Sequence, residues 1–221
     1  MSRLAQDAFK KELAKQYVDP SPEMAGHMDT YFRYMFAGAV PEVVEQLGVQ
    51  EADHVLDVGC GGGHMLHELL RQFPNATASG IDRSAEMVAL AKKRNKRDVV
   101  TGRATFTVAD AIKAMPFGSN TFDIVYSYAL AEFLEDPEPL VRNMHRVLKP
   151  GGLLAVCIRN QEETWDMPLF DSVSRKYGVT PMTNEDLGKI VQDLELGEYM
   201  KATNPWYSCH LKIKAAPGGG Q

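Results

Sequence analysis

The sequence Val55-Leu-Asp-Val-Gly-Cys-Gly-Gly-Gly-His64 decides the fold expected of this chain. Its apolar residues at 55, 56 and 58 are typical of a strand covered on both faces of a parallel sheet. Glycines at 59, 61 and 63 permit positive φ, a tight turn and close approach of a ligand to the backbone. The following residues predict a helix with one apolar face, formed by Leu66, Leu69, Leu70 and Phe73. A strand, a glycine loop and a helix start in this order indicate a nucleotide or nucleoside site.

The composition is that of one soluble globular domain. The chain has 221 residues, of which 44% are hydrophobic and 24% charged, ordinary values for a single α/β unit with a large core. The net charge of -5 disfavours a nucleic-acid partner, since phosphate binding needs a positive footprint. The N-terminus is charged and no apolar stretch approaches about 18 residues, so neither a signal peptide nor a membrane span is expected.

The cysteines are few and far apart in the sequence. Cys60, Cys157 and Cys209 are the three present, and their spacing matches neither a zinc site nor the disulfide framework of a secreted domain. The sequence therefore predicts a reduced, cytoplasmic protein.

From residue 53 onward, stretches typical of strands alternate with stretches typical of helices. We predict strands at 54–60, 77–82, 104–110, 122–128 and 152–160, and helices at 63–73, 84–96 and 137–148, with a short or irregular helix near 111–115. Ser84 is expected to cap the second of these helices. Alternating strands and helices predict a mostly parallel sheet with right-handed crossovers.

The two ends of the chain differ from this alternation. Helical patterns at 1–19 and 22–47 are separated by the prolines at 20 and 22. A helix at 183–194 precedes two runs, 197–203 and 206–214, that predict a closing antiparallel pair. We therefore divide the chain into an N-terminal helical lid (1–50), a ligand-binding α/β domain (51–215) and a disordered tail (216–221).

The glycine loop does not match the dinucleotide fingerprint. That pattern requires a third glycine where His64 stands. Asp57 at the end of the strand would also repel a pyrophosphate, but it would suit a cationic ligand such as the ammonium group of a sulfonium amino acid. Both residues favour S-adenosylmethionine over NAD.

Further segments follow the glycine loop in a characteristic order: Ser79-Gly-Ile-Asp-Arg-Ser-Ala-Glu-Met87, Val108-Ala-Asp-Ala111, Phe122-Asp-Ile-Val-Tyr-Ser127 and Arg146-Val-Leu-Lys-Pro-Gly-Gly152. Together with Asp57-x-Gly59-x-Gly61-x-Gly63, they resemble class I S-adenosylmethionine-dependent methyltransferases of the small-molecule type over residues 53–160. The resemblance implies a Rossmann-like fold with a seven-stranded, mostly parallel sheet, helices on both faces, an antiparallel last strand and an N-terminal helical lid.

The resemblance also implies S-adenosylmethionine as methyl donor, S-adenosylhomocysteine as product and a role for each motif residue. Asp82 is expected to accept hydrogen bonds from the ribose hydroxyls, and Asp57 to organise the glycine loop. Met87 would pack on adenine and Asp110 would accept from its amino group, although core packing and a turn are the respective alternatives. The complete cofactor site implied comprises Asp57, Gly59, Cys60, Gly61, Gly63, Asp82, Arg83, Met87, Asp110, Ala111, Tyr126 and Tyr34, with ordinary strand packing as the alternative for Tyr126.

The methyl acceptor is less legible. Relatives often carry paired histidines after the fourth strand, whereas this chain has Glu132 there, either facing the acceptor or forming an ion pair. His210 in the last predicted strand is a second catalytic candidate, with a structural histidine as its alternative. His64 and His67 lie on one helix with a spacing that gives thin support for a metal, and we predict none. The basic run Lys92-Lys-Arg-Asn-Lys-Arg97 is interpreted as a solvated helix end.

These patterns predict a methyltransferase that acts on an oxygen or nitrogen, less readily a carbon, of a small molecule. The reaction needs no metal, and positioning of the reactants supplies much of the catalysis. A monomer or homodimer without nucleic-acid or membrane partners is expected. The alternatives are an enzyme that uses the same cofactor for a non-methylating reaction, and a cofactor-binding protein with a regulatory or assembly role.

Overall fold

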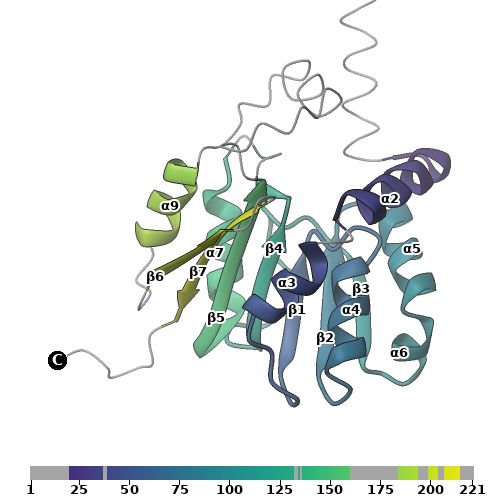
Figure 1. The fold of residues 1–221 in the computed structure, drawn as a ribbon, viewed down its shortest axis with the longest axis horizontal. Coiled ribbons are helices and arrows are strands. Elements are labelled where there is room, and N and C mark those ends of the chain that lie inside the picture. The colour runs from purple at the N-terminus through teal and green to yellow at the C-terminus, as the bar shows by residue number, and fades with distance from the viewer. Residues whose placement is uncertain are drawn as a thin grey trace, which may run out of the picture.

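The computed structural model describes residues 20–36, 39–131, 134, 136–159, 184–193, 199–203 and 207–214. Strands and helices alternate through the middle of this chain (Figure 1). The elements in chain order are α2 (Pro22–Phe36), α3 (Ala39–Gln46), β1 (His54–Val58), α4 (His64–Gln72), β2 (Thr77–Asp82), α5 (Ala85–Arg94), α6 (Lys96–Val100), β3 (Ala104–Val108), β4 (Phe122–Tyr128), α7 (Glu138–Val147), β5 (Leu148–Arg159), α9 (Asn184–Asp193), β6 (Tyr199–Thr203) and β7 (Tyr207–Ile213).

The described strands form one sheet in the order β3-β2-β1-β4-β5-β7-β6. The five strands from β3 to β5 are parallel, and β7 runs antiparallel to both of its neighbours. Successive strands extend from β1 in one direction to β3 and in the other to β5, so the strand order reverses between β1 and β4. Ligands of such sheets bind beyond the carboxyl ends of the strands at this reversal.

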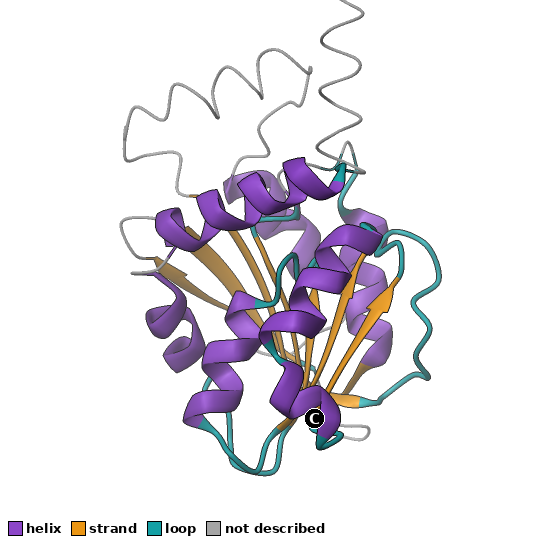
Figure 2. Cartoon of the chain, turned by 90° about the vertical axis from the view of Figure 1, so that its right-hand side faces the viewer, coloured by secondary structure: helices purple, strands orange, loops and turns teal. Residues whose placement is uncertain are grey.

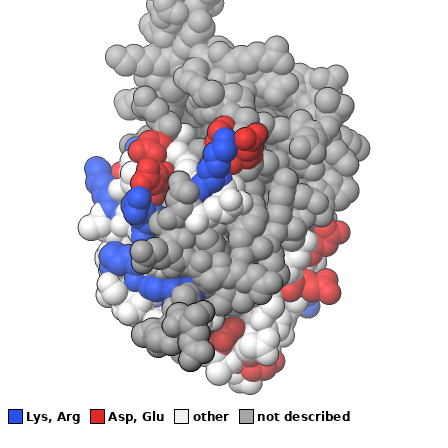
Figure 3. All heavy atoms as spheres, turned by 90° about the vertical axis from the view of Figure 1, so that its left-hand side faces the viewer, with Lys and Arg blue, Asp and Glu red and all other residues white. Residues whose placement is uncertain are grey.

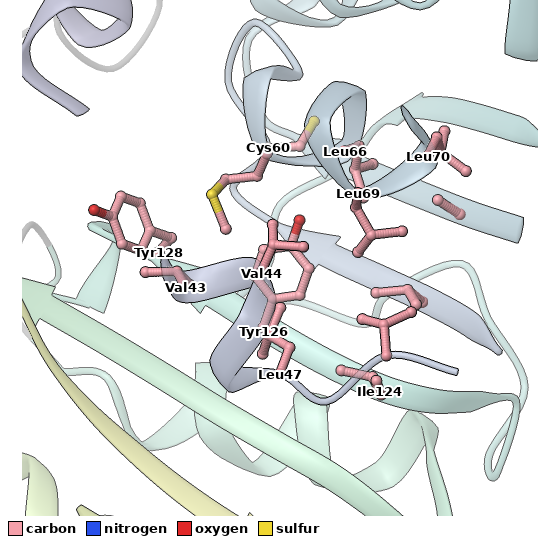
Figure 4. Packing of buried hydrophobic residues seen from close by; sticks show 14 of the residues in the cluster. Val43, Val44, Leu47, Cys60, Leu66, Leu69, Leu70, Ile124, Tyr126 and Tyr128 are labelled. Carbon is pink, nitrogen blue, oxygen red and sulfur yellow. The ribbon is translucent and has the colours of Figure 1, made fainter. Parts of the chain in front are cut away.

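Helices cover both faces of the sheet (Figure 2). One buried cluster joins α3, α4 and α5 to one face, and a second joins α7 and α9 to the other. Because side chains alternate along a strand, Val55 belongs to the first cluster and Leu56 to the second. Figure 4 shows the first cluster, in which the ring of Tyr126 lies with Val44 and Leu47.

The prediction of an α/β fold with a parallel sheet is confirmed, whereas several boundaries were wrong. The helix predicted at 84–96 is two helices that meet at Asn95, whereas the helical region predicted over 22–47 consists, as expected, of more than one segment, α2 and α3. Residues 111–115 form turns rather than a helix. Strand β5 begins at Leu148 instead of residue 152, because Leu148 already pairs with Phe122 of β4. The predictions for 1–19 and 216–221 concern residues outside the described part of the chain.

One cysteine departs from the expectation of a reduced chain. Cys157 is disulfide-bonded, and the residue directly opposite it in the β5–β7 register is Cys209. Cys60 is free and buried. The expectation is therefore wrong at Cys157 in this structure.

The described surface carries both signs of charge on the face drawn in Figure 3. None of the described helices is long and apolar enough to cross a membrane.

Candidate active site

The glycine loop is fastened to the end of strand β2. Gly59, Gly61 and Gly63 have φ of 81°, 50° and 75°, a region that L-residues with a side chain rarely adopt. The N–H groups of Gly59 and Cys60 donate to the carbonyl of Ile81 at 2.8 and 2.9 Å. These bonds hold the turn at the point where the sheet reverses its strand order.

Asp82, the last residue of β2, joins the loop to the next helix. Its Oδ2 accepts from the N–H of Gly61 and its Oδ1 from the N–H of Ser84, both at 2.9 Å. Burial raises the pKa of Asp82, and these N–H donors act in the opposite direction. Each carboxylate oxygen has a second lone pair, so the side chain retains acceptor capacity for ligand hydroxyls.

Asp57 lies deeper, with 2% of its surface exposed. Burial raises the pKa of Asp57 to about 7; the neighbouring Tyr126 hydroxyl partly offsets this effect, and the charge of Asp82 adds to it. The Tyr126 hydroxyl approaches without full hydrogen-bond geometry. Among the described residues, Asp82 rather than Asp57 accepts the N–H of Gly61, and burial disfavours the ionised form of Asp57.

The space around the loop is open at one glycine. A methyl group added at Gly61 would meet no atom within 4 Å, whereas one at Gly59 would lie 2.8 Å from the Leu130 side chain. At Gly63 it would lie 2.9 Å from the Ala91 side chain. Gly61 is therefore the point at which a ligand can approach the loop backbone.

The carbonyl side of the loop is held by the end of α5. The Asn95 amide donates to the carbonyl of Gly63 at 3.1 Å, and the Arg94 guanidinium donates to the carbonyl of Gly62. Arg94 also pairs with Asp29 of α2 at 2.7 Å, and His64 lies 3.0 Å from the same carboxylate. The prediction that the basic run is solvated is therefore wrong at Arg94, whose side chain is 21% exposed.

The predicted adenine residues occupy two neighbouring positions. Met87 is buried and donates its N–H to the Ser84 hydroxyl at 3.2 Å, which makes Ser84 the N-cap of α5 as predicted. Asp110 follows β3 and accepts from the N–H of Ile112 at 3.3 Å, which is the turn alternative, while Ala111 stands beside it with a carbonyl that accepts from Asn143 at 2.9 Å. Arg83 is exposed next to Asp82.

For the remaining predicted site residues, the structure describes no side chain that reaches the open side of the glycine loop. Tyr126 is fully buried, and its hydroxyl lies close to Asp57. Tyr34 lies in α2 and His210 in β7 opposite Val156, and their side chains fall outside the described part, as does Glu132. The described residues contain no group of three or more metal-ligating side chains.

Sequence reasoning missed the residues that approach the loop from elsewhere. Asp29, Asn95 and Leu130 belong to no recognised motif, and Arg94 was hidden in the basic run. The extra glycine at 62 was the one available signal, since the motif requires only 59, 61 and 63. Ala129, which precedes Leu130, adopts a left-handed φ of 55°, and nothing in its sequence predicts that conformation.

Comparison with known proteins identifies the central part of the chain. A family model described as a methyltransferase domain matches residues 56–156. Cycloartenol-C-24-methyltransferase 1 of Oryza sativa subsp. japonica is 39% identical over 121 residues, which cover 53% of this chain and 35% of that protein. The mitochondrial 2-methoxy-6-polyprenyl-1,4-benzoquinol methylase of Caenorhabditis elegans is 34% identical, covering 60% of this chain and 46% of that one. The chain therefore spans between a third and a half of the length of these two relatives.

A solved structure matches at the level of the fold. A SAM-dependent methyltransferase from Aquifex aeolicus superimposes with a TM-score of 0.69 at 21% identity, over 88% of this chain and 99% of that one. The agreement extends beyond the region matched by the family model to most of the described elements.

Proposed function

We propose that this chain, which belongs to the class I S-adenosylmethionine-dependent methyltransferases, transfers a methyl group to an oxygen or nitrogen, less readily a carbon, of a small molecule. The observation that carries the proposal is the pair of carboxylates, the buried Asp57 and the half-buried Asp82, at the carboxyl ends of adjacent parallel strands beside the open glycine. A dinucleotide site would place a pyrophosphate here, and two carboxylates would repel it.

The described residues fit the methyl donor. Asp57 is buried, and no cation is among the causes that shift its pKa in the described part of the chain, so a sulfonium amino acid would supply the positive charge that stabilises its ionised form. Asp82 would accept from the ribose hydroxyls with the lone pairs that Gly61 and Ser84 leave free. Met87 and the turn at Asp110 and Ala111 would hold the adenine ring. Tyr34 of α2 would close over this site, with α2 as the described part of the lid.

S-adenosylmethionine supplies an electrophilic methyl group on a sulfonium. The acceptor forms a bond to the methyl carbon as the carbon–sulfur bond breaks, and the electron pair stays on sulfur in S-adenosylhomocysteine. The chain holds the two reactants in line, which contributes roughly 7–11 kcal/mol in well-oriented reactions. Where the acceptor is a hydroxyl or an ammonium, Glu132 or His210 would take its proton as general base, an effect of about 10²–10⁴-fold.

The small-molecule acceptor, the cytoplasmic location, the monomeric or homodimeric state and the division at residues 50 and 215 are parts of the same proposal. The sequence relatives support a small acceptor, since two of them are named for cycloartenol and for a polyprenyl benzoquinol. They do not agree on one acceptor class.

Two experiments test the proposal in order. Isothermal titration with S-adenosylmethionine and S-adenosylhomocysteine should give saturable binding of both, and failure of both to bind refutes every version of it. Metabolite extracts are then incubated with methyl-labelled S-adenosylmethionine and the protein. Labelled products heavier by one methylene support methyl transfer, whereas binding without a labelled product favours a non-methylating reaction or a regulatory role.

A further inference from the structure

One carboxylate outside the family motifs contacts three parts of the molecule at the glycine loop. Asp29 in the middle of α2 receives two hydrogen bonds from the Arg94 guanidinium, 3.1 Å to Oδ1 and 2.7 Å to Oδ2. Such a paired geometry fixes orientation as well as charge. His64, the first residue of α4, lies 3.0 Å from Oδ1 of the same carboxylate. All three side chains are at most 23% exposed.

Gly62 shows that this contact includes the loop backbone itself. Its φ is not left-handed, so its conformation does not require glycine. A methyl group at this position, however, would overlap the Asp29 carboxylate and lie 2.8 Å from the Arg94 guanidinium. The carbonyl of Gly62 also accepts a hydrogen bond from Arg94. Residue 62 therefore has no side chain because Asp29 occupies that space.

The loop is thus held from two sides by different elements. On one side, N–H groups of the loop donate to the Ile81 carbonyl and the Asp82 carboxylate of strand β2. On the other side, Arg94 and Asn95 at the end of α5 donate hydrogen bonds to the carbonyls of Gly62 and Gly63, respectively. The orientation of Arg94 depends on Asp29, so the second attachment includes α2.

We propose that Asp29 is a positioning residue for the methyl donor, which couples the seating of helix α2 to the conformation of the glycine loop through Arg94 and the Gly62 carbonyl. This inference rests on the proposed function. Asp29 and Arg94 connect α2 to the glycine loop. A ligand that fixes the conformation of the loop would therefore also fix the position of α2.

The charges at this contact support the arrangement. Burial acts to raise the pKa of Asp29, but hydrogen bonds and charge from His64 and Arg94 outweigh it and lower the pKa to about 2. The carboxylate is therefore ionised at neutral pH, and replacing it with an amide removes the charge without changing its shape.

The test uses the full chain with three single substitutions. Asp29→Asn removes the charge, and Arg94→Lys keeps a charge but removes the planar fork. Glu138→Gln is the matched control, because it breaks an exposed ion pair with Arg142 in α7, away from the loop. Titration with S-adenosylmethionine, well below the melting temperature, measures the affinity. Hydrogen exchange of residues 22–36, with and without S-adenosylmethionine, measures the coupling.

We expect Asp29→Asn and Arg94→Lys to raise the Kd by about tenfold, within the range of measured couplings, and Glu138→Gln to leave it unchanged. S-adenosylmethionine should slow exchange in α2 of the wild type and lose this effect in Asp29→Asn. A purely structural role would lower the melting temperature with the Kd unchanged, and that result overturns the inference while leaving the proposed function intact. A wild type that does not bind S-adenosylmethionine overturns both. If Asp29→Asn does not fold, Arg94→Lys decides.

Discussion

Asp57 and Asp82 lie at the ends of neighbouring strands but differ in their hydrogen-bond partners. Asp82 accepts two backbone N–H groups and so stabilises the loop directly. Asp57 has no such donors among the described residues, and its burial disfavours the ionised form. At the scale of single residues, Asp82 therefore shapes the loop, and we expect the ionisation of Asp57 to depend on the charge of the ligand.

Replacing Asp82 should weaken the binding of S-adenosylmethionine. In Asp82→Ala the N–H groups of Gly61 and Ser84 lose their acceptor, and the ribose hydroxyls lose theirs. We expect a loss of about 1–3 kcal/mol in binding free energy by isothermal titration, the range for a hydrogen bond to a charged group. Asp136→Ala is the control, since Asp136 accepts one N–H at 3.0 Å in an exposed turn. Unchanged affinity in a folded Asp82→Ala protein would exclude the ribose assignment.

Asp57 should make this affinity depend on pH. Its pKa in the folded chain is about 7, above the ordinary value of 3.8, so the folded chain holds a proton that the unfolded chain has lost. Its contribution to stability therefore falls as pH rises from about 4 to about 7. A cationic ligand favours the ionised form, so affinity for S-adenosylmethionine should rise with pH over roughly pH 6–8.

The measurement is isothermal titration in two buffers of different ionisation enthalpy, which counts the proton released on binding. Asp57→Asn is the matched variant, because it keeps the shape of the side chain and cannot titrate. The variant should bind S-adenosylmethionine more weakly than the wild type. Its affinity should depend little on pH until about pH 7.7–8, where an α-amino group such as that of the ligand loses its proton. A wild-type affinity that is flat with pH would contradict this account of Asp57.

At the scale of helices and strands, the sequence predicts the elements that depend on residues close together in the chain. It does not predict the boundaries that depend on contacts with distant residues. The strand and helix within 54–72 follow from hydrophobic spacing, and the turn between them follows from the glycines. The break of 84–96 at Asn95 does not, since Asn95 is held by the carbonyl of Gly63, 32 positions earlier in the chain. The early start of β5 depends likewise on the pairing of Leu148 with Phe122. Arg94 was assigned to solvent because its partner, Asp29, lies in another helix.

The close approach of α4 and α5 can be tested with two glycines of nearly equal φ. Gly63 and Gly102 have φ of 75° and 76°, but a methyl group would meet the Asn95 amide at 2.7 Å only at Gly63. Gly102→Ala should lower the free energy of unfolding by about 1–2 kcal/mol from its left-handed φ. Gly63→Ala should add about 1–3 kcal/mol of overpacking. Urea unfolding measures both, and equal losses would show that α4 and α5 are not in tight contact.

At the scale of the whole molecule, the sequence predicts more about the proposed methyl-donor side than about the proposed acceptor side. The donor side is built from short segments in fixed order, so Asp57, the glycines and Asp82 could be predicted together. The contact of α2 could not, because Asp29 is separated from Gly62 by the chain that forms β1 and belongs to no motif. Glu132 and the side chain of His210 lie outside the described residues.

The methyl donor should stabilise the whole fold, because in the proposed site it would contact residues of α2, the glycine loop, the end of β2, α5 and the turn after β3. A ligand that binds only the native state at one hundred times its Kd adds about 2.7 kcal/mol. For a chain of this size, each kcal/mol corresponds to about 2–4 °C in melting temperature. We therefore expect S-adenosylmethionine to raise the melting temperature by roughly 5–10 °C in a thermal shift measurement. Asp82→Ala at the same concentration should show a smaller shift. NAD should give none, since His64 replaces the third glycine and two carboxylates face its pyrophosphate; an equal shift with NAD would return the loop to the dinucleotide interpretation.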